Sequence, residues 1–245
     1  MTNSKVYIHE FIEIKGHNRA KYMHHMTANW CPVGREERNM LCFGVWATIG
    51  STGRWPETVN MWELNGLDGL AANFEHEFAA GRTQDPSLAE WWAVAADLRA
   101  GGFDRIVLPE PWSPTIEELT AGGGRNSVYA HELVTVPPGG ARAFLDALTE
   151  RGRTEMAEHG LTPVGAFNVG MRNGTEAIVL WTMPDWATWV AFERAWEGDA
   201  LRGWRSQLVA LNADVQRVLL VDSPLNPLRT GRQPQVEDRR PLSEI

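Results

Sequence analysis

The chain has 245 residues, of which 43% are hydrophobic and 22% are charged, and it carries a net charge of −8. This composition supports a packed core and excludes a globally disordered chain. The acidic balance, with no cluster of Lys and Arg before the last residues, argues against nucleic acid as a partner, because phosphate backbones would be repelled.

Cysteine usage and apolar patterning bear on the compartment. Cys31 and Cys42 are the only cysteines, and their spacing is not a CxxC motif, so we expect reduced thiols. The first residues show no secretory signal pattern, and no segment approaches 18 consecutive apolar residues. We therefore expect a cytoplasmic protein that does not bind membranes.

The first half alternates between strand and helix signals, read from apolar spacing and from β-branched enrichment. Strands are predicted over 5–14, 40–49, 58–64 and 104–109, and helices over 19–29, 66–80 and from Asp85 to the stop at Gly101-Gly102. A polar connection is expected over 30–39.

The second half repeats that order after a Gly-rich linker over 120–127, which is the natural domain boundary. Strands are predicted over 127–136, 163–170, 177–183 and 215–221, and helices from 141 to 148, 185 to 197 and 199 to 212. Residues 229–245 lack periodicity and are expected to form a flexible tail.

The halves also share sequence. Residues 128–133 (VYAHEL) nearly repeat residues 6–11 (VYIHEF), so that His131 follows His9, and Glu132 follows Glu10, by 122 positions. Further matches, at offsets of 121 and 119, are Gly44 with Gly165 and Trp62 with Trp181. The chain is therefore a tandem repeat of 5–119 and 128–228.

Each repeat reads β-α-β-β-α-(α)-β, which is the ferredoxin-like order. A single sheet of this kind leaves one face without helices, and two such sheets can bury those faces against each other. We predict an α+β fold in which two ferredoxin-like repeats pair as an intramolecular, pseudo-dimeric α+β barrel.

Two stretches point to a family. Residues 129–139, a strand that ends in Pro-Pro-Gly before a helix, and residues 179–192, a Trp-containing strand followed by a helix, resemble NIPSNAP-like domains of the dimeric α+β barrel superfamily, here in tandem form. Residues 58–78 repeat the second pattern, and the resemblance covers most of 5–228. NIPSNAP-like strands usually carry an Arg where this chain has Glu10 and Glu132, so no ligand role of that Arg is transferred.

The superfamily resemblance implies a wide range of activities. It includes small cofactor-free oxygenases, cyclases, isomerases and lyases, heme enzymes such as chlorite dismutases and aldoxime dehydratases, and members without known activity. The fold does not choose among them.

Four residues on the repeated strand are the catalytic candidates. His9 and His131 are suited to general acid/base chemistry near neutral pH. Neighbours along a strand point to opposite faces, so His131 and Glu132 cannot both enter one pocket. Glu10 and Glu132 interrupt apolar faces, where an ionised carboxylate is costly unless it is paired. Each Glu is therefore either bonded to Arg or backbone, or is a base in a cavity.

Aromatic residues supply the candidates for substrate binding. The chain has twelve Trp, which either pack the core or wall an apolar pocket. The predicted substrate-binding residues are Trp46, Trp62, Trp181, Phe167 and Asn168.

No cofactor is predicted, because the sequence lacks zinc, calcium and nucleotide-binding motifs. Heme on His131 or His159, or a divalent metal near the repeated His and Glu residues, stays as an alternative. His24-His25 and Glu75-His76-Glu77 add polar candidates on helices.

The leading hypothesis is an enzyme that performs cofactor-independent acid/base chemistry, of isomerase, cyclase or lyase type, on a hydrophobic oxygenated substrate. His131 or His9 would be the base, with a Glu as partner, in one asymmetric pocket. The alternatives are a heme- or metal-dependent enzyme of the same fold and a non-catalytic ligand-binding or assembly module. A small-molecule substrate is the expected partner, and self-association into a homo-oligomer is compatible with the fold.

Overall fold

The computed structural model describes residues 2–125 and 128–245. The fold is α+β, and its eight strands follow the order β1-β3-β2-β8-β5-β7-β6-β4 of a closed antiparallel barrel. The predicted fold class is thereby confirmed. The chain divides into two compact units, of which unit 1 holds residues 2–3, 106–114 and 128–221, and unit 2 holds residues 4–105, 115–125 and 222–245. Residues 126 and 127, in the expected linker and at the start of the expected strand, lie outside the described residues.

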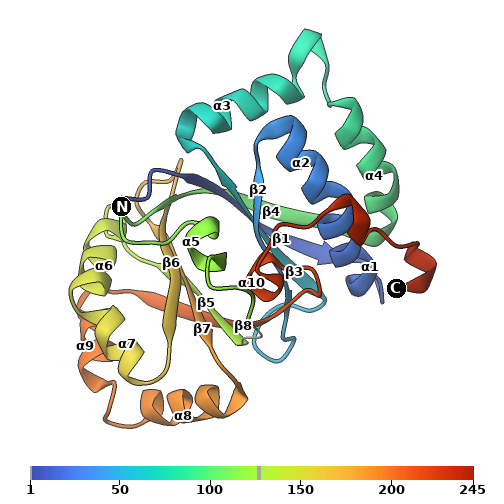
Figure 1. The fold of residues 1–245 in the computed structure, drawn as a ribbon. Coiled ribbons are helices and arrows are strands. Elements are labelled where there is room, and N and C mark those ends of the chain that lie inside the picture. Colours follow the sequence, from blue (N-terminus) through green and yellow to red (C-terminus); the bar gives the residue numbers. More distant parts are fainter. Residues whose placement is uncertain (1, 126–127) are drawn as a thin grey trace. The chain divides into compact units, whose positions relative to one another are not determined.

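Unit 2 is a helix-covered sheet in which β3 pairs with β1 on one side and with β2 on the other. The helices between β1 and β4 gather on one face of this sheet (Figure 1), whereas the backbone N–H at Ile116, near the start of the short helix of 116–120, donates to Glu63 on the other face. The strands are β1 (Val6–Ile14), β2 (Leu41–Thr48), β3 (Glu57–Leu64) and the first part of β4 (Arg99–Pro109). The helical elements are α1 (Arg19–His24), the π-helical turn η1 (His25–Trp30), α2 (Cys31–Arg38), α3 (Gly66–Glu77), η2 (Ala79–Gly81), α4 (Pro86–Leu98), α5 (Ile116–Thr120), α10 (Pro227–Thr230), η4 (Val236–Asp238) and η5 (Leu242–Glu244).

Unit 1 has the same plan, with the strand order β8-β5-β7-β6 and the end of β4 paired with β6. Its strands are β5 (Val128–Thr135), β6 (Thr162–Val169), β7 (Glu176–Met183) and β8 (Asp214–Asp222). Its helical elements are α6 (Ala141–Ala147), the π-helical turn η3 (Leu148–Gly152), α7 (Arg153–Glu158), α8 (Trp186–Glu197) and α9 (Arg202–Ala210).

The duplication extends to local irregularities of the backbone. A bulge interrupts β2 between Cys42 and Gly44, and an equivalent bulge interrupts β6 between Pro163 and Gly165. At both bulges an aromatic ring two residues further along lies over the glycine, Trp46 over Gly44 and Phe167 over Gly165. Each unit also has a π-helical turn within its first helix, at η1 and at η3. The repeated register predicted from sequence is present in the structure.

Two expectations for unit 2 were wrong. The segment expected to be a polar connection contains α2, where Pro32 occupies an early helical position that tolerates its missing N–H. This polar helix packs against its unit through Arg38, which is buried and forms ion pairs with Glu77 and Asp85. The second expectation was a strand that starts at residue 104, whereas β4 begins at Arg99 and includes both glycines. Gly102 lies so close to the carbonyl of Phe11 that a side chain there would collide with it.

The C-terminal residues differ from the flexible tail that we expected. The side chain of Gln233 receives a hydrogen bond from the backbone N–H of Cys42 (2.9 Å) and donates one to its carbonyl (2.8 Å). Arg35 donates to the carbonyl of Pro234 and to the side chain of Gln235. These bonds attach residues 232–245 to unit 2.

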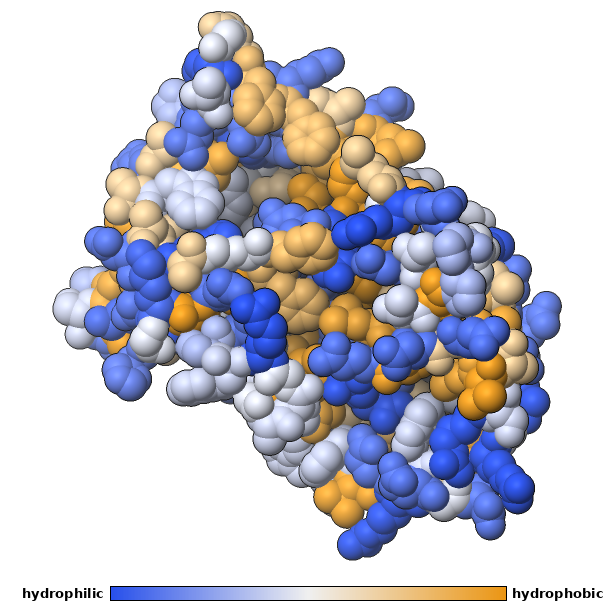
Figure 2. All heavy atoms as spheres, turned by 180° about the vertical axis from the view of Figure 1, so that it is seen from behind, coloured by the Kyte–Doolittle hydropathy of each residue, from blue (hydrophilic) through white to orange (hydrophobic). Residues whose placement is uncertain are grey.

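The surface of unit 2 carries apolar side chains among charged ones. Leu67 and Phe74 on α3 and Phe78 directly after it are exposed, and apolar residues interrupt the charged surface in the space-filling view (Figure 2). Among the residues that the structure describes, none of the helices has both the length and the apolar character needed to cross a bilayer.

The close contact at the β2 bulge gives a first test. A methyl group at Gly44 would overlap the Trp46 ring, so we expect Gly44→Ala to lower the free energy of unfolding by about 1 to 3 kcal/mol. Gly101→Ala is the control, since its methyl group would meet only the Glu13 carboxylate at 3.6 Å. Urea denaturation measures both variants, and equal stabilities would contradict the contact.

Candidate functional site

The two candidate residues on β1 point to opposite faces of the sheet. Glu10 lies opposite Asn60 of β3 and faces the helices, whereas His9 lies opposite Met61 and faces the other way. Glu10 keeps part of its surface accessible, whereas His9 is fully buried. The candidate functional site in unit 2 therefore lies between the sheet and the helices, around Glu10.

Three polar side chains from three elements meet at this site. The Asn60 amide donates to the Glu10 carboxylate (Nδ2 to Oε2, 2.8 Å), and the same nitrogen lies 3.0 Å from the Tyr22 hydroxyl of α1. The Trp62 indole also hydrogen-bonds to Glu10. Tyr22 and Asn60 are completely buried. The carboxylate is thus held by uncharged groups, and Glu10 is the half-buried residue among these buried ones.

The surroundings of Glu10 change its acidity. Burial, and the nearby Asp104 carboxylate as a smaller cause, raise the pKa of Glu10 from 4.5 to about 7, against the hydrogen bonds from Asn60 and Trp62 and the charge of Arg99. Burial also raises the pKa of the Tyr22 hydroxyl, which keeps it a neutral phenol. A carboxyl group with a pKa near 7 can accept and return a proton at neutral pH.

The equivalent carboxylate in unit 1 has a different environment. Glu132 accepts a hydrogen bond from the Trp181 indole (2.8 Å) and two from Arg217 (Nη2 at 2.8 Å and Nε at 3.1 Å). The Arg217 guanidinium lies over the rings of Phe192 and Trp196. Glu132 is therefore a paired, buried carboxylate, which is the structural role considered for it from sequence.

The other predicted residues are divided by face. His131 is also buried, and it lies on the face opposite to Glu132 because its strand partner is Leu180 whereas that of Glu132 is Val179. By the same alternation, Trp62 and Trp181 lie on the helix-covered faces, and Trp46 and Phe167 lie on the opposite faces. Asn168 on β6 is half-buried and lies opposite Leu108 of β4. The catalytic role of the His residues and the substrate-binding role of the aromatic residues stay predictions.

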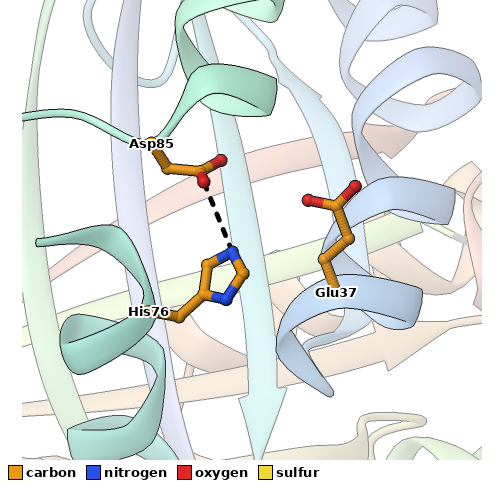
Figure 3. A group of neighbouring side chains, drawn as sticks. All are labelled: Glu37, His76 and Asp85. Carbon is orange, nitrogen blue, oxygen red and sulfur yellow. Dashed lines mark ion pairs between the residues drawn. The ribbon is translucent and has the colours of Figure 1, made fainter. Parts of the chain in front are cut away.

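One group of side chains in unit 2 has the composition of a metal site. Glu37, His76 and Asp85 place ligand atoms within 4.8 Å of one another (Figure 3). Asp85, however, forms ion pairs with Arg38 (3.3 Å) and Arg82 (3.8 Å) and lies 3.4 Å from His76 Nε2. Two guanidinium groups beside the buried carboxylate would repel a divalent cation. The group fits an ion-pair network better than a metal centre.

Comparisons with known proteins bear on the fold. No protein-family model and no curated protein sequence matches the chain. A putative monooxygenase from Fusobacterium nucleatum has a similar structure over 91% of this chain and 94% of that chain, with 12% identity and a TM-score of 0.57. An anthrone oxidase-like protein is similar over 90% of this chain and 94% of that chain, with 11% identity and a TM-score of 0.57. At these identities the similarity shows the shared fold.

The NIPSNAP resemblance receives less support. A NIPSNAP-like domain protein from Burkholderia xenovorans aligns with 46% of this chain and 90% of that chain, with 15% identity and a TM-score of 0.37. That score is too low to carry an argument. Membership of the NIPSNAP family therefore stays a prediction, and the α+β barrel fold is the shared feature.

Sequence analysis did not identify Tyr22 and Asn60. Tyr22 lies within a predicted helix that carries no motif, and its contact with Asn60 joins residues 38 positions apart. One signal was present, because Asn60 is an amide in the middle of a strand that is buried along its whole length. A buried amide needs polar partners.

We expect that replacing Glu10 and replacing Glu132 by Gln will have opposite effects on the free energy of unfolding. The raised pKa of Glu10 means that its protonation stabilises the folded state below pH 4.5, and this contribution is lost as the pH rises through 7. We expect Glu10→Gln to remove that loss and to be more stable than the wild type at pH 8 by up to about 3 kcal/mol. Glu132→Gln should destabilise by about 2 kcal/mol or more, because Arg217 loses its charged partner.

Urea denaturation between pH 4 and pH 8 measures both variants. The wild-type free energy of unfolding should fall relative to that of Glu10→Gln as the pH rises. A difference between these two proteins that does not change with pH would contradict the raised pKa.

Proposed function

We propose that this protein is an enzyme that performs cofactor-independent acid/base chemistry on a hydrophobic, oxygenated small molecule, with Glu10 as the base. The observation that carries the proposal is a half-buried glutamate beneath helices, whose carboxylate is held by the neutral amide of Asn60 at 2.8 Å. A carboxylate in such a place is poised to react, because neither an arginine nor a lysine hydrogen-bonds to it within the described residues. Glu132, in contrast, forms an ion pair with Arg217.

The chemistry follows from the properties of the group. The Glu10 carboxylate takes a proton from a carbon next to a substrate carbonyl, and the electron pair of that C–H bond moves onto the carbonyl oxygen as an enolate. The resulting carboxylic acid returns the proton to a different atom, which completes an isomerisation without a net change of atoms. A pKa of about 7 populates both forms at neutral pH.

Asn60 and Tyr22 act as positioning residues. Both are completely buried, so they act on the substrate through Glu10. Asn60 fixes the orientation of the carboxylate, and the contact with Tyr22 fixes the amide of Asn60. Apolar neighbours on the same face, such as Ile8 and Trp62, favour a hydrophobic substrate.

The proposal is tested by hydrogen exchange at carbon. Hydrophobic ketones with acidic C–H bonds, 2-tetralone and anthrone, are incubated with the protein in D₂O, and loss of the C–H signal is followed by proton NMR. We expect catalysed exchange that rises with pH about a midpoint near 7. Glu10→Gln should lower the protein-dependent rate by about a hundredfold or more, because it removes the base.

Two further variants separate the roles. Glu13→Gln is the matched control, since Glu13 lies on the same strand, is partly exposed and pairs with Arg54, and it should keep the wild-type rate. Tyr22→Phe should keep exchange but shift the pH midpoint, which a purely structural role would not do. Equal rates in the wild type and Glu10→Gln would refute the assignment of the base.

A cofactor-independent oxygenase is the second candidate, because the similar structures include proteins named as a monooxygenase and as anthrone oxidase-like. The same proton abstraction would begin the reaction. Dioxygen would then convert a CH₂ group to C=O, with one oxygen atom entering the substrate and the other leaving as water with the two hydrogens. Oxygen consumption with anthrone, absent in Glu10→Gln, would favour this candidate.

A further inference from the structure

Unit 2 contains a cavity of about 380 Å³ within its helical layer, away from the Glu10 cluster. This is the size of a small ligand site. Residues of η1, α2 and α4 line it together with Arg239 near the C-terminus. Those that matter here are His25, Trp30, Glu37, Glu90, Trp91 and Arg239.

The aromatic wall of this cavity is held by hydrogen bonds and stacking. The His25 ring stacks on Trp91, with centroids 5.2 Å apart and planes 4° from parallel. His25 Nε2 lies 3.0 Å from the carbonyl of Trp91, and its Nδ1 lies 2.8 Å from the Asn29 amide, so both ring nitrogens have partners. Burial lowers the pKa of His25, which keeps the ring neutral. The wall is therefore preformed and adds no positive charge.

Trp30 completes the aromatic wall. Its ring centroid lies 5.8 Å from that of Trp91, and the Arg38 guanidinium lies over its ring at 5.2 Å. Trp30 thus already contacts a cation outside the cavity. Aromatic rings next to carboxylates are the usual surroundings of bound organic cations.

The charges around the cavity are unbalanced. Glu37 and Glu90 are exposed, and neither forms an ion pair with any residue that the structure describes. Asp85, drawn with Glu37 and His76 in Figure 3, forms ion pairs with Arg38 and Arg82. Arg239 is the basic residue of the lining, and its Nε donates to the carbonyl of Ala28 at 3.3 Å. The lining therefore contains two carboxylates and one guanidinium.

From this geometry we infer that the cavity is a second ligand site, which binds a small organic cation, an amine with an apolar or aromatic body. The carboxylates of Glu37 and Glu90 contact the ammonium group, and Trp30 and Trp91 contact the body. A bare metal ion would leave most of the cavity empty and would lack ligands on its aromatic side. An anion would meet the two uncompensated carboxylates.

This site is separate from the proposed catalytic cluster. None of Glu10, Asn60 and Tyr22 lines the cavity, although the Trp91 ring of its lining lies 6.4 Å from the Tyr22 ring, measured between centroids. Binding of a cation and proton abstraction by Glu10 can therefore fail independently of each other.

Binding is measured on the full chain by isothermal titration calorimetry with 2-phenylethylamine and tetramethylammonium. The neutral 2-phenylethanol is the reference for the apolar body alone. We expect both cations to bind, and the amine to bind about tenfold or more tightly than the alcohol. The double variant Glu37→Gln/Glu90→Gln should weaken amine binding by about tenfold, since it removes two exposed ion pairs.

Glu36→Gln is the matched control, because Glu36 is exposed on the same helix but pairs with Arg35. It should bind the amine like the wild type, and the double variant should keep its catalysed exchange of ketone protons. Equal affinity for amine and alcohol, unchanged binding by the double variant, or no binding of either cation would each overturn the inference.

Discussion

The cost of placing a carboxylate on a strand beneath helices governs much of this structure. Each repeat carries a Glu at the same position of its first strand, and a Trp of the neighbouring strand hydrogen-bonds to it. Such a group must be paired with a charge or must give up its own charge. In unit 1, Arg217 of β8 provides the opposite charge. In unit 2, Glu10 is instead bonded to the neutral amide of Asn60, which contacts the Tyr22 hydroxyl.

This difference separates the two proposed roles, a structural one for Glu132 and a reactive one for Glu10. A carboxylate that accepts two hydrogen bonds from an arginine is fixed in place, so its contribution is to stability. A buried carboxylate held by neutral donors has a raised pKa and exchanges its proton near neutral pH. Because its charged form is disfavoured, it accepts a proton readily, as a general base must. The duplicated fold therefore allows the same position to differ between the copies, with an arginine-paired carboxylate in unit 1 and a carboxylate of raised pKa in unit 2.

The sequence predicted the fold class and the alternation that places His9 and Glu10 on opposite faces, because these depend on local periodicity. It did not predict α2, whose stability comes from ion pairs of the buried Arg38 with residues more than thirty positions away. It also missed the attachment of the last residues, which depends on contacts far apart in the sequence, such as those of Gln233 with the backbone of Cys42 and of Arg35 with Gln235. The contact between Tyr22 and Asn60 is also a tertiary contact, so the sequence did not predict it. Its one sign in the sequence was the polar Asn60 within an apolar strand.

The most direct test of this account is the titration of Glu10 itself. The carboxyl carbon signal of Glu10 can be followed by ¹³C NMR between pH 3 and pH 9 and assigned by its absence in Glu10→Gln. The account predicts a midpoint near 7, because burial without a paired cation favours the protonated form. A midpoint near the ordinary value of 4.5 would show that the carboxylate is solvated or paired, and would contradict its role as a base.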